Sequence, residues 1–95
     1  MAFAATRPAV TTSATKIAEN TSTHASDGEA VSFLVKNATG TAAVFLGADN
    51  TVAAANGFQW DTADGSLSVD LEPGEQLWGI VAATTQTLHV LKQGR

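Results

Sequence analysis

The sequence predicts an all-β protein, a small antiparallel β-sandwich or barrel of about seven short strands. Two observations lead to this fold class. Residues 66–71 alternate polar and apolar side chains, and such alternation places successive side chains on opposite faces of a sheet. Turn signals also recur along the chain, at close to the roughly 8–12 residue spacing that is typical of sandwiches and barrels.

The second half of the chain contains three predicted strands, at residues 66–71, 76–82 and 86–92. A tight turn at residues 72–75 separates the first two. Pro73 fixes φ at the second position of this turn, and Gly74 supplies the positive φ that a type II turn requires next. Residues 83–85 separate the second strand from the third.

The first half is less regular. Its clearest strand is residues 30–36, and residues 41–46 form the next. The loop that ends at Gly40 predicts that these two strands pair as an antiparallel hairpin. Residues 10–18 are rich in threonine and predict an edge strand. Residues 47–65 are expected to be a long excursion between strands, in which residues 58–60 can form a short strand.

The 95 residues are expected to form one domain, with a flexible N-terminal arm at residues 1–8 and a single β domain at residues 9–95. The arm has a small, mixed composition, and Pro8 biases Arg7 towards extended conformations. We expect such an arm to order on a neighbouring subunit, where Phe3 would add apolar contact.

The alternation also predicts which side chains line the interior between the sheets. They are Val31, Phe33, Val35, Val44, Leu46, Leu67, Val69, Leu71, Ile80, Leu88 and Val90. Trp78 lies between Leu77 and Ile80 and is expected in the core as well.

Composition narrows the classes of function. Charged residues make up 15% of the chain, below the roughly 25% of typical domains, and small side chains take their place. Such a surface suits packing against other protein. The net charge is −4 and the five basic residues are scattered, so we do not expect nucleic acid as a partner. There is no cysteine for disulfides or thiolate metal sites, and no secretory signal or membrane-spanning run is recognised.

Neither histidine predicts catalysis. His24 falls in a polar loop and His89 in the last strand, and no nucleophile-elbow motif accompanies them. Both are expected at the surface, and the chain is not expected to be an enzyme.

A calcium loop is a second candidate for chemistry. Asp61 and Glu72 have the spacing of the first and twelfth positions of an EF-hand. Ala63 and Gly65 replace the side-chain ligands at the third and fifth positions, so Asp64 and Gly65 are better explained as a hairpin turn. No metal or other cofactor is expected.

Phe58, Trp60 and Trp78 could form a platform on which a sugar stacks. Because Gln59 and Asp61 flank Trp60 in a region rich in loops, we favour a semi-exposed side chain that contacts another protein. The predicted interface residues are therefore Phe3, Arg7, Phe58 and Trp60.

Several motifs occur in a characteristic order along residues 31–92. They are V-F-L-G at residues 44–47, N-G-F at residues 56–58, L-S-V-D-L-E-P-G-E-Q-L-W at residues 67–78, and L-H-V-L at residues 88–91. Together they resemble small virion proteins of tailed bacteriophages, of the head decoration or cement type.

The resemblance implies a small β-sandwich or barrel on the capsid surface of the virion, with the major capsid protein as its partner and a homotrimer as the favoured assembly. It implies no catalytic residues. A carbohydrate- or receptor-binding module of a tail fibre is the alternative that the resemblance leaves open.

Overall fold

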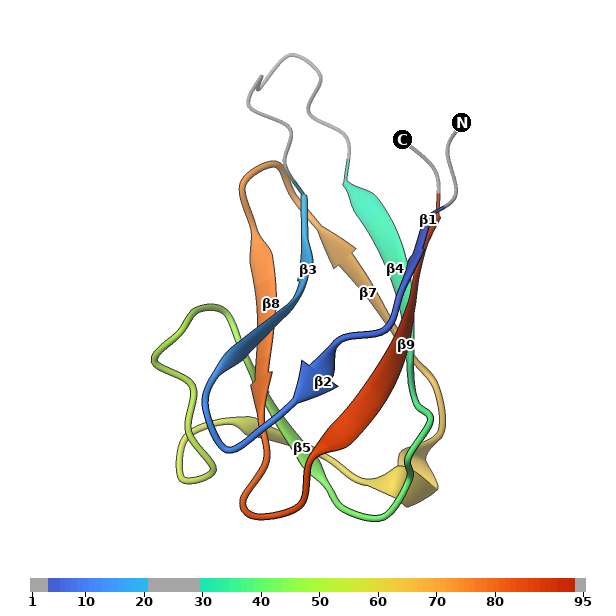
Figure 1. Ribbon diagram of the computed structural model, residues 1–95. Helices are drawn as coiled ribbons and strands as arrows, with labels where there is room; N and C mark the ends of the chain where they lie inside the picture. The colour runs from blue at the N-terminus through green and yellow to red at the C-terminus, as the bar shows by residue number, and fades with distance from the viewer. Residues whose placement is uncertain (1–3, 21–29, 94–95) are drawn as a thin grey trace.

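The computed structural model describes residues 4–20 and 30–93, and within them nine strands form two antiparallel sheets packed as a sandwich (Figure 1). The predicted fold class is confirmed. The first sheet has the order β1 (Ala4–Thr6), β9 (Gln86–Gln93), β4 (Val31–Asn37), β7 (Leu67–Leu71), and β2 (Ala9–Val10) also pairs with β9. The second sheet has the order β3 (Thr15–Glu19), β8 (Gln76–Ile80), β5 (Val44–Gly47), β6 (Phe58–Trp60). A short 3-10 helix, η1 (Thr62–Asp64), precedes β7.

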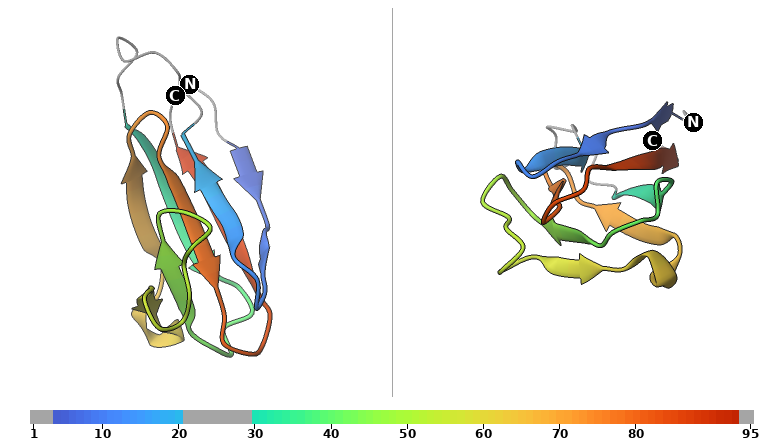
Figure 2. Two further views of the ribbon diagram at one scale, coloured as in Figure 1. Left: turned by 90° about the vertical axis from the view of Figure 1, so that its left-hand side faces the viewer. Right: turned by 60° about the horizontal axis from the view of Figure 1, so that its bottom comes forward.

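The N-terminal segment is part of the first sheet from Ala4 onward. β1 and β2 follow one line beside β9, where Ala5 lies opposite Leu91 and Ala9 opposite Thr87 (Figure 2). Between them the carbonyl of Pro8 accepts a hydrogen bond from the backbone N–H of Leu88 at 2.9 Å. The prediction of a loose arm is therefore wrong for residues 4–8, because their backbone groups pair with β9. Phe3 lies outside the described residues.

The predicted hairpin between residues 30–36 and 41–46 is also wrong. β4 lies between β9 and β7 in the first sheet, whereas β5 lies between β8 and β6 in the second. The connection over residues 38–43 crosses from one sheet to the other. The Asn37 side chain holds this crossing, since it accepts a hydrogen bond from the Gly40 N–H and donates one to the Ala42 carbonyl.

The buried side chain of Gln86 ties the same crossing to the start of β9. Its oxygen accepts hydrogen bonds from Asn37 Nδ2 and from the backbone N–H groups of Thr41 and Ala42, at 3.0–3.2 Å. Its nitrogen donates to the Thr41 hydroxyl and to the carbonyls of Thr84 and Thr85. Gln86 is completely buried, so this side chain replaces the water that these loop groups would otherwise bind.

The turn between β7 and β8 has the predicted conformation. Gly74 has a φ of 84°, and the backbone N–H of Glu75 donates to the Glu72 carbonyl at 2.9 Å. Asn20, which follows β3, makes two hydrogen bonds to the turn. Its backbone carbonyl accepts one from the Gly74 N–H, and its side chain donates one to the Leu71 carbonyl. Through Asn20 the turn between β7 and β8 is therefore also joined to β3, an edge strand of the second sheet.

The core lies between the two sheets and agrees with most of the prediction. Eight of the predicted core residues are buried, namely Val31, Phe33, Val35, Val44, Leu46, Leu71, Leu88 and Val90. Leu67 and Val69 are partly buried against this cluster. The described core also includes Val10, Ile17, Leu77 and Val81.

The prediction for β8 chose the wrong face. Leu77, Gly79 and Val81 are buried, whereas Trp78 and Ile80 are only half-buried. Gly79 explains why the face with Leu77 is the buried one, because a Cβ at position 79 would lie 2.7 Å from Ile17 Cδ1. The glycine lets Ile17 of the neighbouring strand pack over β8. The Trp78 indole N–H donates to the Gln76 side chain at 2.7 Å, on the outward side of the strand.

Candidate functional site

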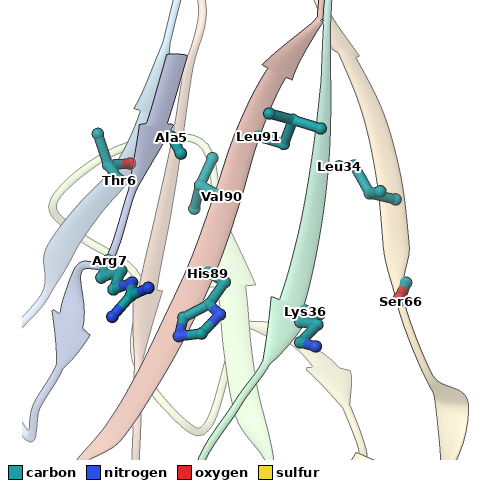
Figure 3. Close-up of a pocket in the computed structure, with 9 residues that line it drawn as sticks. All are labelled: Ala5, Thr6, Arg7, Leu34, Lys36, Ser66, His89, Val90 and Leu91. Atoms are coloured by element: carbon teal, nitrogen blue, oxygen red, sulfur yellow. The ribbon is translucent and has the colours of Figure 1, made fainter. Parts of the chain in front are cut away.

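The outer face of the first sheet carries a hollow of about 260 Å³, which we call the Arg7 hollow. Its lining residues lie in or next to the four neighbouring strands β1, β9, β4 and β7. They include Arg7, His89, Lys36, Ser66, Leu34 and Leu91. Figure 3 shows Arg7, His89 and Lys36 at one level and Leu91 and Leu34 at the next. The hollow is thus a shallow, open site.

Strand register explains this arrangement. Lys36 of β4 lies opposite His89 of β9, and Leu34 lies opposite Leu91. Thr6 lies opposite Val90, so the next residue, Arg7, comes beside His89. Two rows of side chains therefore cross the sheet, one with a guanidinium, an imidazole and an ammonium group, and one with two leucines.

Among the residues that the structure describes, no carboxylate lines the Arg7 hollow. Within the described residues the one ion pair joins Lys16 and Glu19 on β3, so neither Arg7 nor Lys36 is paired with an acid there. Arg7 and Lys36 are both exposed. A protein of net charge −4 thus gathers two of its five basic side chains at one place, and neither pairs with an acidic residue among residues 4–20 and 30–93.

A second surface feature is an apolar groove of about 440 Å³ between the two sheets, which we call the Phe58 groove. Its apolar lining consists of Leu46, Phe58, Leu67, Val69, Leu71 and Leu77. Phe58 is 67% exposed, although it pairs with Leu46 of the core. A large, exposed aromatic side chain is therefore part of the lining of an open groove, which Asp70 and Glu75 also line.

The groove is open because two edge strands of unequal length meet there. β7 pairs only with β4, and β6 pairs only with β5, among the described strands. β6 has three residues and β7 has five, so β6 does not cover the whole inner side of β7. Leu67 and Val69 are accordingly half-buried rather than buried. An uncovered edge of this kind is available for contact with another chain.

The four predicted interface residues do not come together. Arg7 lines the hollow and Phe58 the groove, as surface residues. Trp60 was predicted to be semi-exposed, and this is wrong: it is 3% exposed, lies opposite Val44, and donates its indole N–H to the Gly65 carbonyl at 3.0 Å. Phe3 lies outside the described residues.

Sequence reasoning missed the role of Lys36, His89 and the two leucines. A local signal exists, since Leu34 and Lys36 are two residues apart on β4, as are His89 and Leu91 on β9. Residues two apart in a strand share a face. The pairing of β4 with β9, which brings the two pairs together, is non-local.

The other candidates for chemistry are accounted for structurally. His24 lies outside the described residues. Asp61 and Asp64 cap η1, where the Asp64 carboxylate accepts the Asp61 N–H at 2.9 Å, and Gly65 follows with a φ of 73°. The predicted hairpin turn at Asp64 and Gly65 is wrong, because β6 and β7 belong to different sheets. Within the residues that the structure describes, no three potential ligands gather as a metal site.

Two carboxyl groups have shifted pKa values. Hydrogen bonds from Lys16 and Gln76 lower the pKa of Glu19, and hydrogen bonds from the Thr51 hydroxyl and backbone N–H lower the pKa of Asp49. Such a group favours the folded state above its unfolded pKa, and this contribution disappears as the pH falls through the folded pKa. Both groups are outside the hollow and the groove, and both are explained by local structure.

No helix in the described part of the chain is long and apolar enough to cross a membrane. Comparisons with protein family models, with curated proteins and with solved structures gave no match to this chain.

Proposed function

We propose that this protein is a structural virion protein of a tailed bacteriophage, which binds the outer surface of the capsid and stabilises it. The proposal rests on the sequence motifs of residues 31–92 and on the surface described above. Its partner is the major capsid protein, and a homotrimer is the assembly that we favour.

The observation that carries the proposal is the exposed Phe58 beside the Phe58 groove. Isolated apolar side chains are common on protein surfaces, but an exposed aromatic group beside a largely apolar groove is typical of a protein contact site. Aromatic anchors of this kind contribute much of the binding energy when they are buried in an interface. Binding to the folded form would also raise the stability of this small domain by mass action.

The sugar-binding alternative has less support from the aromatic side chains. A stacking platform made of Phe58, Trp60 and Trp78 would need all three rings on one accessible surface. Trp60 is buried, and Trp78 is half-buried and hydrogen-bonded to Gln76. Only Phe58 of the three is broadly exposed.

Phe58→Ser should weaken the binding of the purified chain to undecorated capsids about tenfold, because the variant loses an aromatic anchor. Co-sedimentation with capsids that lack this chain measures the affinity. Gln59→Ser is a matched control, since Gln59 is an exposed neighbour on β6 whose side chain points to the other face. Circular dichroism should show the same β-fold for both variants.

Two results would contradict the proposal. One is failure of the wild-type chain to bind capsids. The other is binding of the wild-type chain to a defined glycan on an array, with no affinity for capsids. The second result would support the tail-fibre alternative instead.

A further inference from the structure

We propose that the Arg7 hollow binds an extended acidic segment of the partner protein, in which a carboxylate and an aliphatic side chain are separated by one residue. This inference deepens the proposed capsid-binding function and rests on it. It names the chemistry of the capsid segment that meets this face of the first sheet.

The positive charges of Arg7 and Lys36 at the hollow favour binding of a carboxylate from another molecule. Arg7 and Lys36 stand on either side of His89, and no acidic residue of the described part of the chain lines the hollow. Among the described residues, the acid on the same face of the sheet is Asp70, which accepts a hydrogen bond from Ser32 at 2.6 Å, in a different row. Arginine offers a planar fork of donors that matches a carboxylate, and hydrogen bonds between charged groups are stronger than neutral ones.

The second row of the hollow is apolar. Leu34 is 37% exposed, and Leu91 lies directly opposite it on β9. Ala5 flanks Leu91 on β1, and Ser68 flanks Leu34 on β7, so no charged group interrupts this row. An aliphatic side chain placed here would cover the two leucines and remove them from water.

The distance between the rows sets the spacing of the partner's side chains. Each row is two residues from the next along β4 and β9, which corresponds to roughly 6.6–6.8 Å. An extended segment presents every second side chain on one face with the same repeat. When such a segment runs along the strands with its carboxylate over Arg7, His89 and Lys36, the side chain two residues further on lies over the leucines.

The hollow adjoins the Phe58 groove across a single strand. Ser66 lines the hollow, and Leu67, the next residue, lines the groove. Because β7 is an edge strand, a partner that wraps around it contacts both surfaces. We therefore treat the Arg7 hollow and the Phe58 groove as two parts of one docking surface.

Binding of short fluorescent peptides to the purified full-length chain tests the inference. The probe peptide contains the order glutamate, neutral spacer, leucine. The glutamate and the leucine are therefore separated by one residue. One control peptide replaces glutamate with glutamine, and another keeps the composition but places glutamate and leucine next to each other. We expect the probe to bind about tenfold more tightly than either control, with a marked loss of affinity at high salt.

Variants locate the binding site. Arg7→Gln combined with Lys36→Gln should weaken binding of the probe about tenfold. Lys92→Gln is the matched control, because Lys92 is on the same strand as His89 but on the other face of the sheet, opposite Phe33. In an NMR titration, the signals of Lys36, His89 and Leu91 should shift when the probe is added.

Equal affinity for the probe and the glutamine peptide would overturn the inference. So would equal losses in the double variant and in Lys92→Gln. These results are distinct from a failure of the proposed function, since the peptide assay contains no capsid and the co-sedimentation assay contains no peptide.

Discussion

Replacing Phe33 with alanine should lower the free energy of unfolding by about 3–5 kcal/mol. Phe33 is 4% exposed, in the middle of β4, and β4 is flanked on both sides by other strands of the first sheet. Its ring is part of the core between the two sheets. The alanine variant loses the burial of the ring and leaves a cavity that strands held by neighbours on both sides cannot collapse to fill.

Reversible chemical denaturation of both proteins measures this loss. Phe58→Ala is the matched control, because it removes the same ring from a site that is 67% exposed, and it should cost less than about 1 kcal/mol. A loss below about 1 kcal/mol for Phe33→Ala would mean that the assignment of the inner face of β4 is incorrect.

Replacing Gln86 with leucine should cost about 3–4 kcal/mol, although leucine is apolar and similar in size. The side chain of Gln86 makes six hydrogen bonds to residues before β5 and before β9. Leucine satisfies none of these partners, and buried donors and acceptors without partners are costly. The crossing over residues 38–43 would lose its attachment to β9.

Gln59→Leu is the control for this substitution. Gln59 is exposed and makes one side-chain hydrogen bond, to Asp61, so its replacement should change stability by less than about 0.5 kcal/mol. Thermal unfolding followed by circular dichroism gives both values. Similar melting temperatures for Gln86→Leu and the wild type would show that the hydrogen bonds of Gln86 contribute little.

Local patterns in the sequence predicted the features that depend on neighbouring residues. The alternation of residues 67–71 placed Leu67, Val69 and Leu71 on one face of a strand, and all three side chains point to the core side of β7. The turn at Pro73 and Gly74 followed from the conformations that proline and glycine favour. Phe58 was predicted as an interface residue, and its side chain is exposed.

Features that depend on distant residues could not be predicted in this way. The pairing of β4 with β7 and β9, instead of with β5, is set by contacts between strands far apart in the sequence. The face of β8 was ambiguous because both of its faces carry apolar residues, and Gly79 decided it through its contact with Ile17. β1 is too short to recognise without β9 beside it.

The same distinction applies to the candidate site. Arg7 was predicted as an interface residue, but its neighbours Lys36 and His89 are brought to it by strand register. Trp60 appeared exposed because polar residues flank it, yet its indole N–H finds a partner in the Gly65 carbonyl, which allows burial. Polar neighbours in the sequence therefore did not report the environment of this side chain.

Quantitative mass spectrometry of purified virions tests the central claim, which is that this chain coats the capsid. We predict that this chain is stoichiometric with the major capsid protein, at a fixed molar ratio, and that heads separated from tails show the same ratio. A chain that is absent from virions, or present only in the tail fraction, would contradict the claim.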